Sequence, residues 1–152
     1  MPTTHRKLIL PPVYLCVALL AMLLGHLAAP TLRIIAPPAS LLGAIPIAVG
    51  IALTLFADRA LKKHGTTVKP FERSSHLVTS GIFAVSRHPM YLGMVLILAG
   101  LAVLLGTLTP FVVVLVFAVL LDVRFISAEE RILAEAFGDT WRLYRRRVRR
   151  WL

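Results

Sequence analysis

The chain has 152 residues, of which 58% are hydrophobic and 16% charged, and its formal net charge is +10. This composition excludes a disordered chain and is too apolar for an ordinary soluble domain. The hydrophobic residues are gathered in long blocks, as is typical of membrane proteins. We therefore expect an all-α, polytopic integral membrane protein that forms a single domain over residues 1–152.

Four apolar segments approach the length of about 20 residues that a bilayer-spanning helix needs, with a lower limit of about 17. They cover approximately residues 13–29, 41–57, 90–105 and 109–126. A turn through Gly106 and Pro110 joins the last two segments into a tight hairpin. A signal peptide is the alternative for the first segment, but Pro30 directly follows the small residues Ala28 and Ala29, which makes cleavage there unfavourable.

Basic residues are distributed unevenly between the loops. The loop between the first two segments contains Arg33 alone, and the third loop contains no basic residue. The N-terminal stretch, the second loop and the C-terminal stretch hold the others, among them Arg6, Lys7, Lys69 and Arg73. By the positive-inside rule, both termini and the second loop are cytoplasmic, and an even number of spans agrees with this orientation.

The C-terminal stretch is basic and aromatic. The run Arg145–Arg147 lies between Trp141 and Trp151, a composition that favours contact with anionic lipid headgroups and interfacial burial of the indole rings. No nucleic-acid-binding motif accompanies it, so we expect no nucleic-acid partner. We expect a helical extension of the fourth segment, an interruption near Gly138 and then a basic surface helix.

The first polar cluster is the heptapeptide Arg87-His88-Pro89-Met90-Tyr91-Leu92-Gly93, which precedes a long apolar run. Ionisable groups at the mouth of a membrane helix are costly to desolvate and usually mark a functional site. Pro89 suits the first turn of the third segment, and the free N–H groups of that turn can face an anion. An interfacial anchor built from Arg and Tyr is the alternative.

The second polar cluster, Glu129-Glu130, follows the fourth segment on the same side of the membrane. Adjacent residues face different directions on a helix, so one acid points inward more easily and the other can pair with Arg87 or Arg131. A solvated helix surface is the alternative. A carboxylate can accept hydrogen bonds from both hydroxyls of a ribose. We expect no metal site, because the chain has a single cysteine and the spacing of His76 and His88 does not resemble a ligand set.

Several short motifs together resemble the isoprenylcysteine carboxyl methyltransferase family, which belongs with the membrane phospholipid methyltransferases. The resemblance covers Gly65 to Trp151, and Gly65-Thr66-Thr67-Val68 with Pro70 is similar to its small bacterial members. The other motifs are Leu77–Phe83, Arg87–Gly93, Glu129-Glu130-Arg131 with Leu133, Phe137-Gly138, Tyr144, Val148 and Arg150-Trp151. This resemblance implies a methyltransferase of a bacterial inner membrane.

The resemblance also implies S-adenosyl-L-methionine as methyl donor, bound at the cytoplasmic face beneath the C-terminal segment. Arg87 and Arg124 are the implied catalytic residues, and Arg124 is the nearest counterpart of an arginine tied to substrate in the eukaryotic members. The implied cofactor-binding residues are Leu77, Val78, Phe83, His88, Pro89, Tyr91, Gly93, Glu129 and Glu130. Phe83 stands where the family usually has Tyr, so the hydroxyl of that position is lost.

The implied methyl acceptor is a lipophilic molecule that arrives from the bilayer. A prenylated carboxylate, a phospholipid amine, a quinone-like lipid and a hydrophobic thiol all fit this description. Two other readings of the sequence remain. One is an NADPH-dependent membrane sterol or lipid reductase, because those enzymes share a related Arg-His-x-x-Tyr-x-Gly segment. The other is a non-enzymatic membrane scaffold. The oligomeric state is left open.

Overall fold

The computed structural model describes residues 10–28, 30, 33–65 and 76–152. Within these ranges the chain is mostly helical. The expected features at Arg6, Lys7, Lys69, Arg73 and 66–70 lie outside the described residues. The elements in order are α1 (Pro11–Ala28), η1 (Ala39–Gly43), α2 (Ala44–Lys63), η2 (Gly81–Ala84), α3 (Pro89–Leu105), α4 (Leu108–Leu121), the π-helix η3 (Asp122–Ile126) and α5 (Ser127–Arg147).

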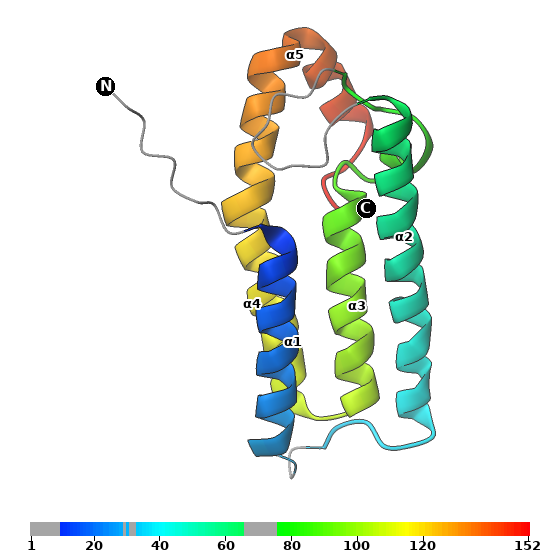
Figure 1. Ribbon diagram of the computed structural model, residues 1–152, viewed down its shortest axis with the longest axis vertical. Coiled ribbons are helices and arrows are strands. Elements are labelled where there is room, and N and C mark those ends of the chain that lie inside the picture. The colour runs from blue at the N-terminus through cyan, green and yellow to red at the C-terminus, as the bar shows by residue number, and fades with distance from the viewer. Residues whose placement is uncertain (1–9, 29, 31–32, 66–75) are drawn as a thin grey trace, which may run out of the picture.

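Helices α1 to α4 form an elongated antiparallel bundle (Figure 1). Helix α3 packs against α2 on one side and against α4 on the other, while α1 lies along α4. Both the α1–α2 link and the α3–α4 hairpin lie at one end of this bundle. The other end, which we call the basic end, holds the end of α2, the start of α3, helix α5 and the C-terminus.

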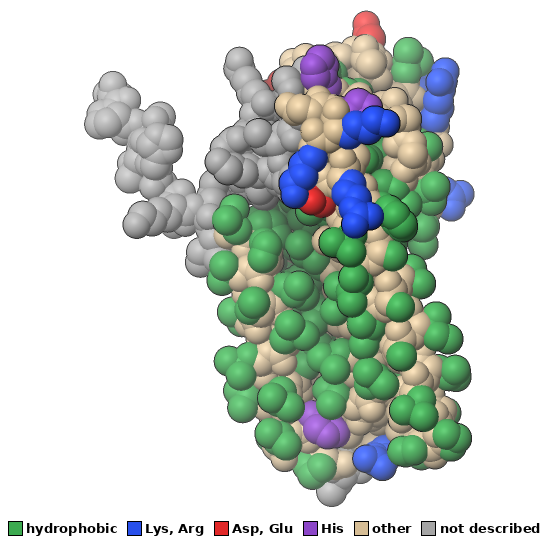
Figure 2. All heavy atoms as spheres, turned by 45° about the vertical axis from the view of Figure 1, so that its right-hand side comes forward, with side chains coloured by type: hydrophobic (Ala, Val, Ile, Leu, Met, Phe, Trp, Pro, Cys, Tyr) green, Lys and Arg blue, Asp and Glu red, His purple; other side chains and the backbone are tan. Residues whose placement is uncertain are grey.

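Three helices are long and apolar enough to cross a membrane: Pro11–Ala28, Ala39–Lys63 and Leu108–Arg147. Helix α3 is also apolar but has 17 residues, which is the lower limit for a span. Hydrophobic side chains cover the shaft of the bundle, whereas Lys and Arg gather at the basic end (Figure 2). The structure thus confirms the all-α polytopic membrane fold.

The helix boundaries differ from the sequence expectation in two places. Helix α2 continues past residue 57 to Lys63, because Asp58 and Lys62 pair across one turn at 2.6 Å and keep the charged end helical. The hairpin turn consists of Gly106 and Thr107 only, and Pro110 lies inside the first turn of α4. Proline is tolerated there because the first N–H groups of a helix have no intrahelical partner.

Small residues let α2 and α3 approach each other closely. A Cβ atom on Gly50 would lie 2.5 Å from the carbonyl oxygen of Gly93, and one on Gly93 would lie 2.6 Å from the oxygen of Gly50. Close backbone contact through small residues is a usual way for membrane helices to associate. The first polar cluster therefore begins on a helix whose position is fixed by packing.

Helix α4 leads into α5 without a loop. The π-helix η3 widens the helix between the two, and Ser127 Oγ donates to the carbonyl oxygen of Asp122 at 2.8 Å. Short π-helical turns are rare and often lie at functional sites. Further along, Gly138 has φ 48° and ψ −118°, so α5 bends there, as the sequence predicts. The segment after this bend folds back toward the start of α3 (Figure 1).

Candidate active site

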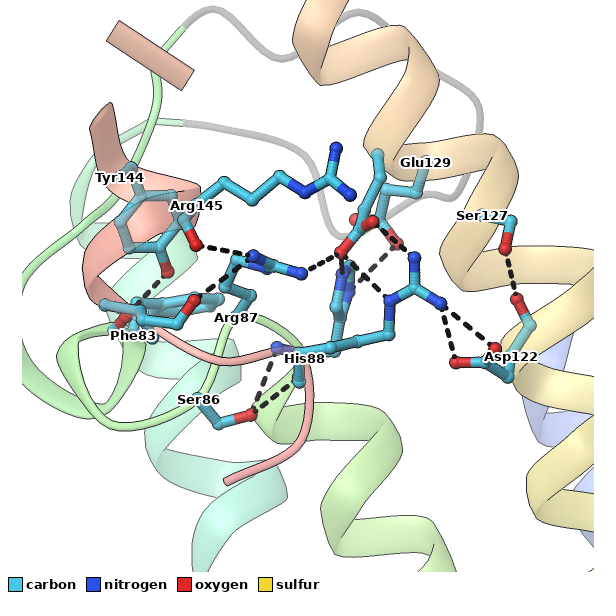
Figure 3. A network of polar contacts seen from close by, with 12 residues as sticks. Phe83, Ser86, Arg87, His88, Asp122, Ser127, Glu129, Tyr144 and Arg145 are labelled. Carbon is cyan, nitrogen blue, oxygen red and sulfur yellow. Dashed lines mark hydrogen bonds and ion pairs between the residues drawn. The ribbon is translucent and has the colours of Figure 1, made fainter. Parts of the chain in front are cut away.

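The start of α3 presents the first polar cluster. His88 is the residue before the helix, and Pro89 occupies the first helical position. The backbone N–H of His88 donates to Ser86 Oγ at 3.2 Å, and both residues are buried. The local sequence therefore sets the direction in which Arg87 and His88 leave the backbone. Both side chains point toward α5 (Figure 3).

Glu130 lies at the centre of a buried ionic network. Its Oε1 accepts from Arg87 Nη2 at 2.7 Å and lies 3.3 Å from His88 Nε2, while its Oε2 accepts from Arg150 Nη2 at 2.6 Å. Burial opposes ionisation, but hydrogen bonds from His88 and Arg150 and the charges of Arg87 and Arg150 lower the pKa of Glu130 to about 2. Glu130 is therefore an ionised structural centre with its oxygens already engaged.

Glu129 differs from its neighbour. Its Oε2 is buried and has no hydrogen-bond partner, and it lies 3.8 Å from His88 Nδ1. About a third of the side chain remains accessible, at 35%. Burial raises the pKa of Glu129 above its usual range, and the charge of His88 and a side-chain hydrogen bond with Tyr91 only partly offset this. A buried unpaired polar atom costs about 1–3 kcal/mol and calls for a partner, which a ligand can supply.

The C-terminal segment closes over the network. The backbone N–H of Arg87 donates to the carbonyl oxygen of Arg149 at 3.1 Å, and Arg87 Nη1 donates to the carbonyl oxygens of Arg145 and Val148. The Arg87 guanidinium also lies over the Trp141 ring, 5.6 Å from its centroid. These contacts attach the part of α5 beyond the Gly138 bend to the start of α3.

Arg150 connects this segment to the π-helix. Its Nη1 donates to both carboxylate oxygens of Asp122, at 3.0 and 3.1 Å, while its Nη2 holds Glu130 (Figure 3). The two guanidiniums of Arg87 and Arg150 thus engage Asp122 and Glu130, while Glu129 lies beside His88.

Aromatic rings continue from the ionic network into the bundle. The His88 ring stacks on Tyr91 with 5.8 Å between centroids, and Tyr91 lies 6.4 Å from Phe125. Phe125 in turn meets Tyr14 of α1 edge-on at 5.3 Å. The polar side chains of the site therefore border an apolar wall that reaches toward the membrane-facing helix α1.

The structure brings together the central residues that the sequence predicts. Arg87, His88, Glu129 and Glu130 form one cluster, and Pro89 and Tyr91 lie directly beside it. Arg87 is itself buried, with 6% of its side chain exposed.

The other predicted site residues lie elsewhere. Leu77 packs with Trp141 and Tyr144, and Val78 and Phe83 pack against Ala57 of α2. Gly93 faces α2, as described above.

Arg124, the second expected catalytic residue, does not join the cluster. It is exposed on η3, next to the inward-facing Phe125, and no hydrogen bond or ion pair links it to another described residue. The helix turn that buries Phe125 directs Arg124 away from the network. Asp122 and Arg150 take part instead, although neither was selected from the sequence. Asp122 is an acid inside the fourth apolar segment, and a charge at such a position was the available signal.

No group of three or more His, Cys, Asp or Glu side chains could hold a metal ion in the part of the chain that the structure describes. The geometry instead defines a polytopic membrane protein with a buried ionic site at its basic end and an aromatic wall beside it. A sequence profile of the phospholipid methyltransferase family matches residues 38–140. The chain therefore belongs to this family of integral membrane methyltransferases, as its motifs indicate.

Individual relatives agree with this family. The chain is 41% identical over 75 residues to protein-S-isoprenylcysteine O-methyltransferase of Schizosaccharomyces pombe, a match that covers 47% of this chain and 30% of that protein. It is 38% identical over 63 residues to an uncharacterised protein of Haemophilus influenzae, covering 41% of this chain and 100% of that protein.

A solved structure shares the fold. The eukaryotic intramembrane Ras methyltransferase, isoprenylcysteine carboxyl methyltransferase, superposes with a TM-score of 0.69 at 21% identity. The superposition covers 99% of this chain and 53% of that one, so the chain spans about half the length of the solved relative. At this level of identity, the likeness concerns the fold.

Proposed function

We propose that this protein transfers a methyl group from S-adenosyl-L-methionine to a lipophilic acceptor at the cytoplasmic face of the membrane. The observation that carries the proposal is the state of Glu129. Its Oε2 is buried 3.8 Å from His88 Nδ1 and has no hydrogen-bond partner, while both oxygens of the adjacent Glu130 are engaged by Arg87 and Arg150. One acid of the pair therefore holds the site together, and the other is available to a ligand.

The described residues fit this methyl donor. Glu129 supplies a carboxylate that can accept hydrogen bonds from the ribose hydroxyls. Arg87 Nε is a second buried polar atom without a partner. The family assignment also favours methyl transfer over the reductase and scaffold alternatives.

When bound, the donor supplies an activated methyl group, which forms a bond to the acceptor's nucleophilic atom as the bond to sulfur breaks and sulfur keeps the electron pair. The protein's own residues provide position and a dry environment. Glu130, Arg87 and Arg150 fix the helices around the site. The backbone N–H of Arg87 donates to the carbonyl oxygen of Arg149, and Ser86 Oγ donates to that of Arg150. These bonds hold the C-terminal segment over the site as a lid.

The acceptor would approach along the aromatic wall formed by Tyr91, Phe125 and Tyr14. These rings lie between the ionic cluster and α1, whose side chains Val17, Leu20 and Leu24 are exposed on the membrane-facing surface. An acceptor with an apolar chain could thus reach the polar site without leaving the bilayer. A carboxylate or thiolate acceptor needs no base, whereas an amine must lose a proton.

A methyl-transfer assay tests the proposal. Purified protein receives S-adenosyl-L-methionine with a tritiated methyl group and is offered total lipid, a prenylcysteine and a hydrophobic thiol in parallel. We expect label in at least one organic-soluble product with the wild type and Glu135→Gln, and strongly reduced label with Glu129→Gln. Glu135 is exposed on the same helix, so it is a matched control. Equal transfer by all three proteins would remove Glu129 from the site.

A further inference from the structure

A second concave surface lies at the basic end, apart from the ionic cluster. It is a groove of about 470 Å³ between the segment around η2 and the part of α5 beyond the Gly138 bend. It shares no lining residue with the Arg87–Glu130–Arg150 network. Its lining consists of Thr79, Ala84, Thr140, Leu143, Tyr144, Arg147 and Val148.

Three polar side chains of this groove have no partner among the described residues. The Arg147 guanidinium makes no hydrogen bond or ion pair with any residue that the structure describes, and the same is true of the Thr79 and Thr140 hydroxyls. The Tyr144 hydroxyl is not available, because it donates to the carbonyl oxygen of Phe83 at 2.6 Å. No acid lines the groove. One guanidinium and two hydroxyls on one concave surface match the needs of a phosphate group.

The surroundings of the groove favour a membrane lipid over a soluble phosphate. Leu143 on its lining is 55% exposed, and the nearby Val85 is 58% exposed. Exposed apolar side chains beside a cationic group are suited to the interface between headgroups and acyl chains. The stretch from Trp141 to Arg150 contains six arginines, of which only Arg142 and Arg150 pair with acids of the described chain. The other four give this surface a potential that attracts lipids with net negative charge.

We propose that this groove binds the phosphate-bearing headgroup of an anionic phospholipid. Arg147 and the two threonine hydroxyls hold the phosphate, and Leu143 and Val148 contact the apolar part of the lipid. A choline headgroup is disfavoured, because its ammonium would lie among unpaired arginines. The bound lipid bridges Thr79 to Arg147 and so attaches α5 to the segment that precedes α3. This lipid is a ligand of the fold and is distinct from the methyl acceptor.

Thermal unfolding of the purified protein in a neutral detergent tests this proposal. Phosphatidylglycerol, phosphatidylcholine and inorganic phosphate are added separately to the wild type, to Arg147→Gln and to Arg146→Gln. Arg146 is the adjacent exposed residue and does not line the groove, so both variants lose the same charge. We expect phosphatidylglycerol to raise Tm of the wild type and of Arg146→Gln, and Arg147→Gln to lose at least half of that shift.

Other outcomes would overturn the proposal. Equal losses in the two arginine variants would show that the lipid responds only to overall charge. An equal Tm shift with phosphatidylcholine or with inorganic phosphate would reject an anionic lipid as the ligand. If Arg147→Gln does not fold, Thr140→Val provides a second test that leaves the charge unchanged. This variant should show a smaller Tm shift with phosphatidylglycerol. An unchanged shift would show that the groove does not bind the lipid.

Discussion

Arg150 Nη2 lies 2.6 Å from Glu130 Oε2, although the two residues are 20 positions apart and separated by the Gly138 bend. This contact joins the end of the chain to the start of α5. Because Arg87 reaches the other oxygen of the same carboxylate, Glu130 holds three segments together: the start of α3, the start of α5 and the C-terminal segment. The stability of the site therefore depends on the ionisation of Glu130.

We expect acid to destabilise the protein through Glu130. The folded pKa, about 2, lies below the ordinary value of 4.5, so this group stabilises the fold above about pH 4.5 and loses that contribution as the pH falls toward 2. This difference between the two pKa values corresponds to a contribution of about 3 kcal/mol to the free energy of unfolding. Thermal unfolding across this pH range should show Glu130→Gln well below the wild type at pH 7, with the two converging near pH 2. Parallel curves at all pH values would contradict the assignment.

Whereas Glu130→Gln should destabilise the protein, Glu129→Gln should stabilise it when no ligand is bound. A carboxyl whose folded pKa is raised is penalised when it ionises, so its charge lowers the stability at pH values above the ordinary range. Removal of that charge should raise Tm at pH 8, and the gain over the wild type should shrink as the pH falls toward 4.5 and be absent below it. Differential scanning fluorimetry checks this, with the exposed Glu135→Gln as control. A lower Tm for Glu129→Gln at pH 8 would show that Glu129 is already paired.

The different surroundings of Glu129 and Glu130 show which features of the site the sequence could predict and which it could not. The membrane side shared by Arg87–Gly93 and Glu129-Glu130 was readable from the order of apolar segments and charges. Which acid pairs with Arg87 was not readable, because it depends on the helix rotation through η3. The five-residue π-helical turn over Asp122–Ile126 changes that rotation and has no clear sequence signal.

The same reasoning explains why Arg124 lies outside the ionic cluster. Arg124 lies closest in sequence to the acids, but a helix places neighbours in sequence on different faces. Arg150 reaches the acids only because the chain bends at Gly138 and returns. The glycine predicted the bend, but no local pattern gives the direction of the returning segment. His26 is a similar case, since its partner Thr107 is 81 positions away in the sequence.

Arg124→Gln should leave binding of the methyl donor unchanged. Its side chain is exposed and lies outside the ionic cluster, so affinity for S-adenosylhomocysteine should stay within about twofold of the wild type. Arg87→Gln should instead destabilise the fold by about 3–5 kcal/mol, because it leaves Glu130 buried with one partner fewer. Isothermal titration calorimetry measures the affinity of Arg124→Gln, and thermal unfolding measures the stability of both variants. Weaker binding by Arg124→Gln at unchanged Tm would return Arg124 to the cofactor site.

Membrane orientation can be tested at the end of the bundle opposite the basic end. Ala36 is exposed in the α1–α2 link, where Arg33 is the nearest described basic residue. In a Cys16→Ala background, Ala36→Cys should react with an impermeant maleimide in intact cells, whereas Glu135→Cys on α5 should react only after permeabilisation. The reverse pattern would place the basic end outside the cytoplasm.

Binding of S-adenosylhomocysteine by isothermal titration calorimetry tests the central claim most directly, that Glu129 is the acid reserved for the methyl donor. The wild type and Glu135→Gln should bind with equal affinity. Glu129→Gln should bind about ten- to hundredfold more weakly, as expected for the loss of a charged hydrogen bond worth about 1.5–3 kcal/mol. Equal affinity of Glu129→Gln and the wild type, or no binding by a folded wild type, would contradict the account.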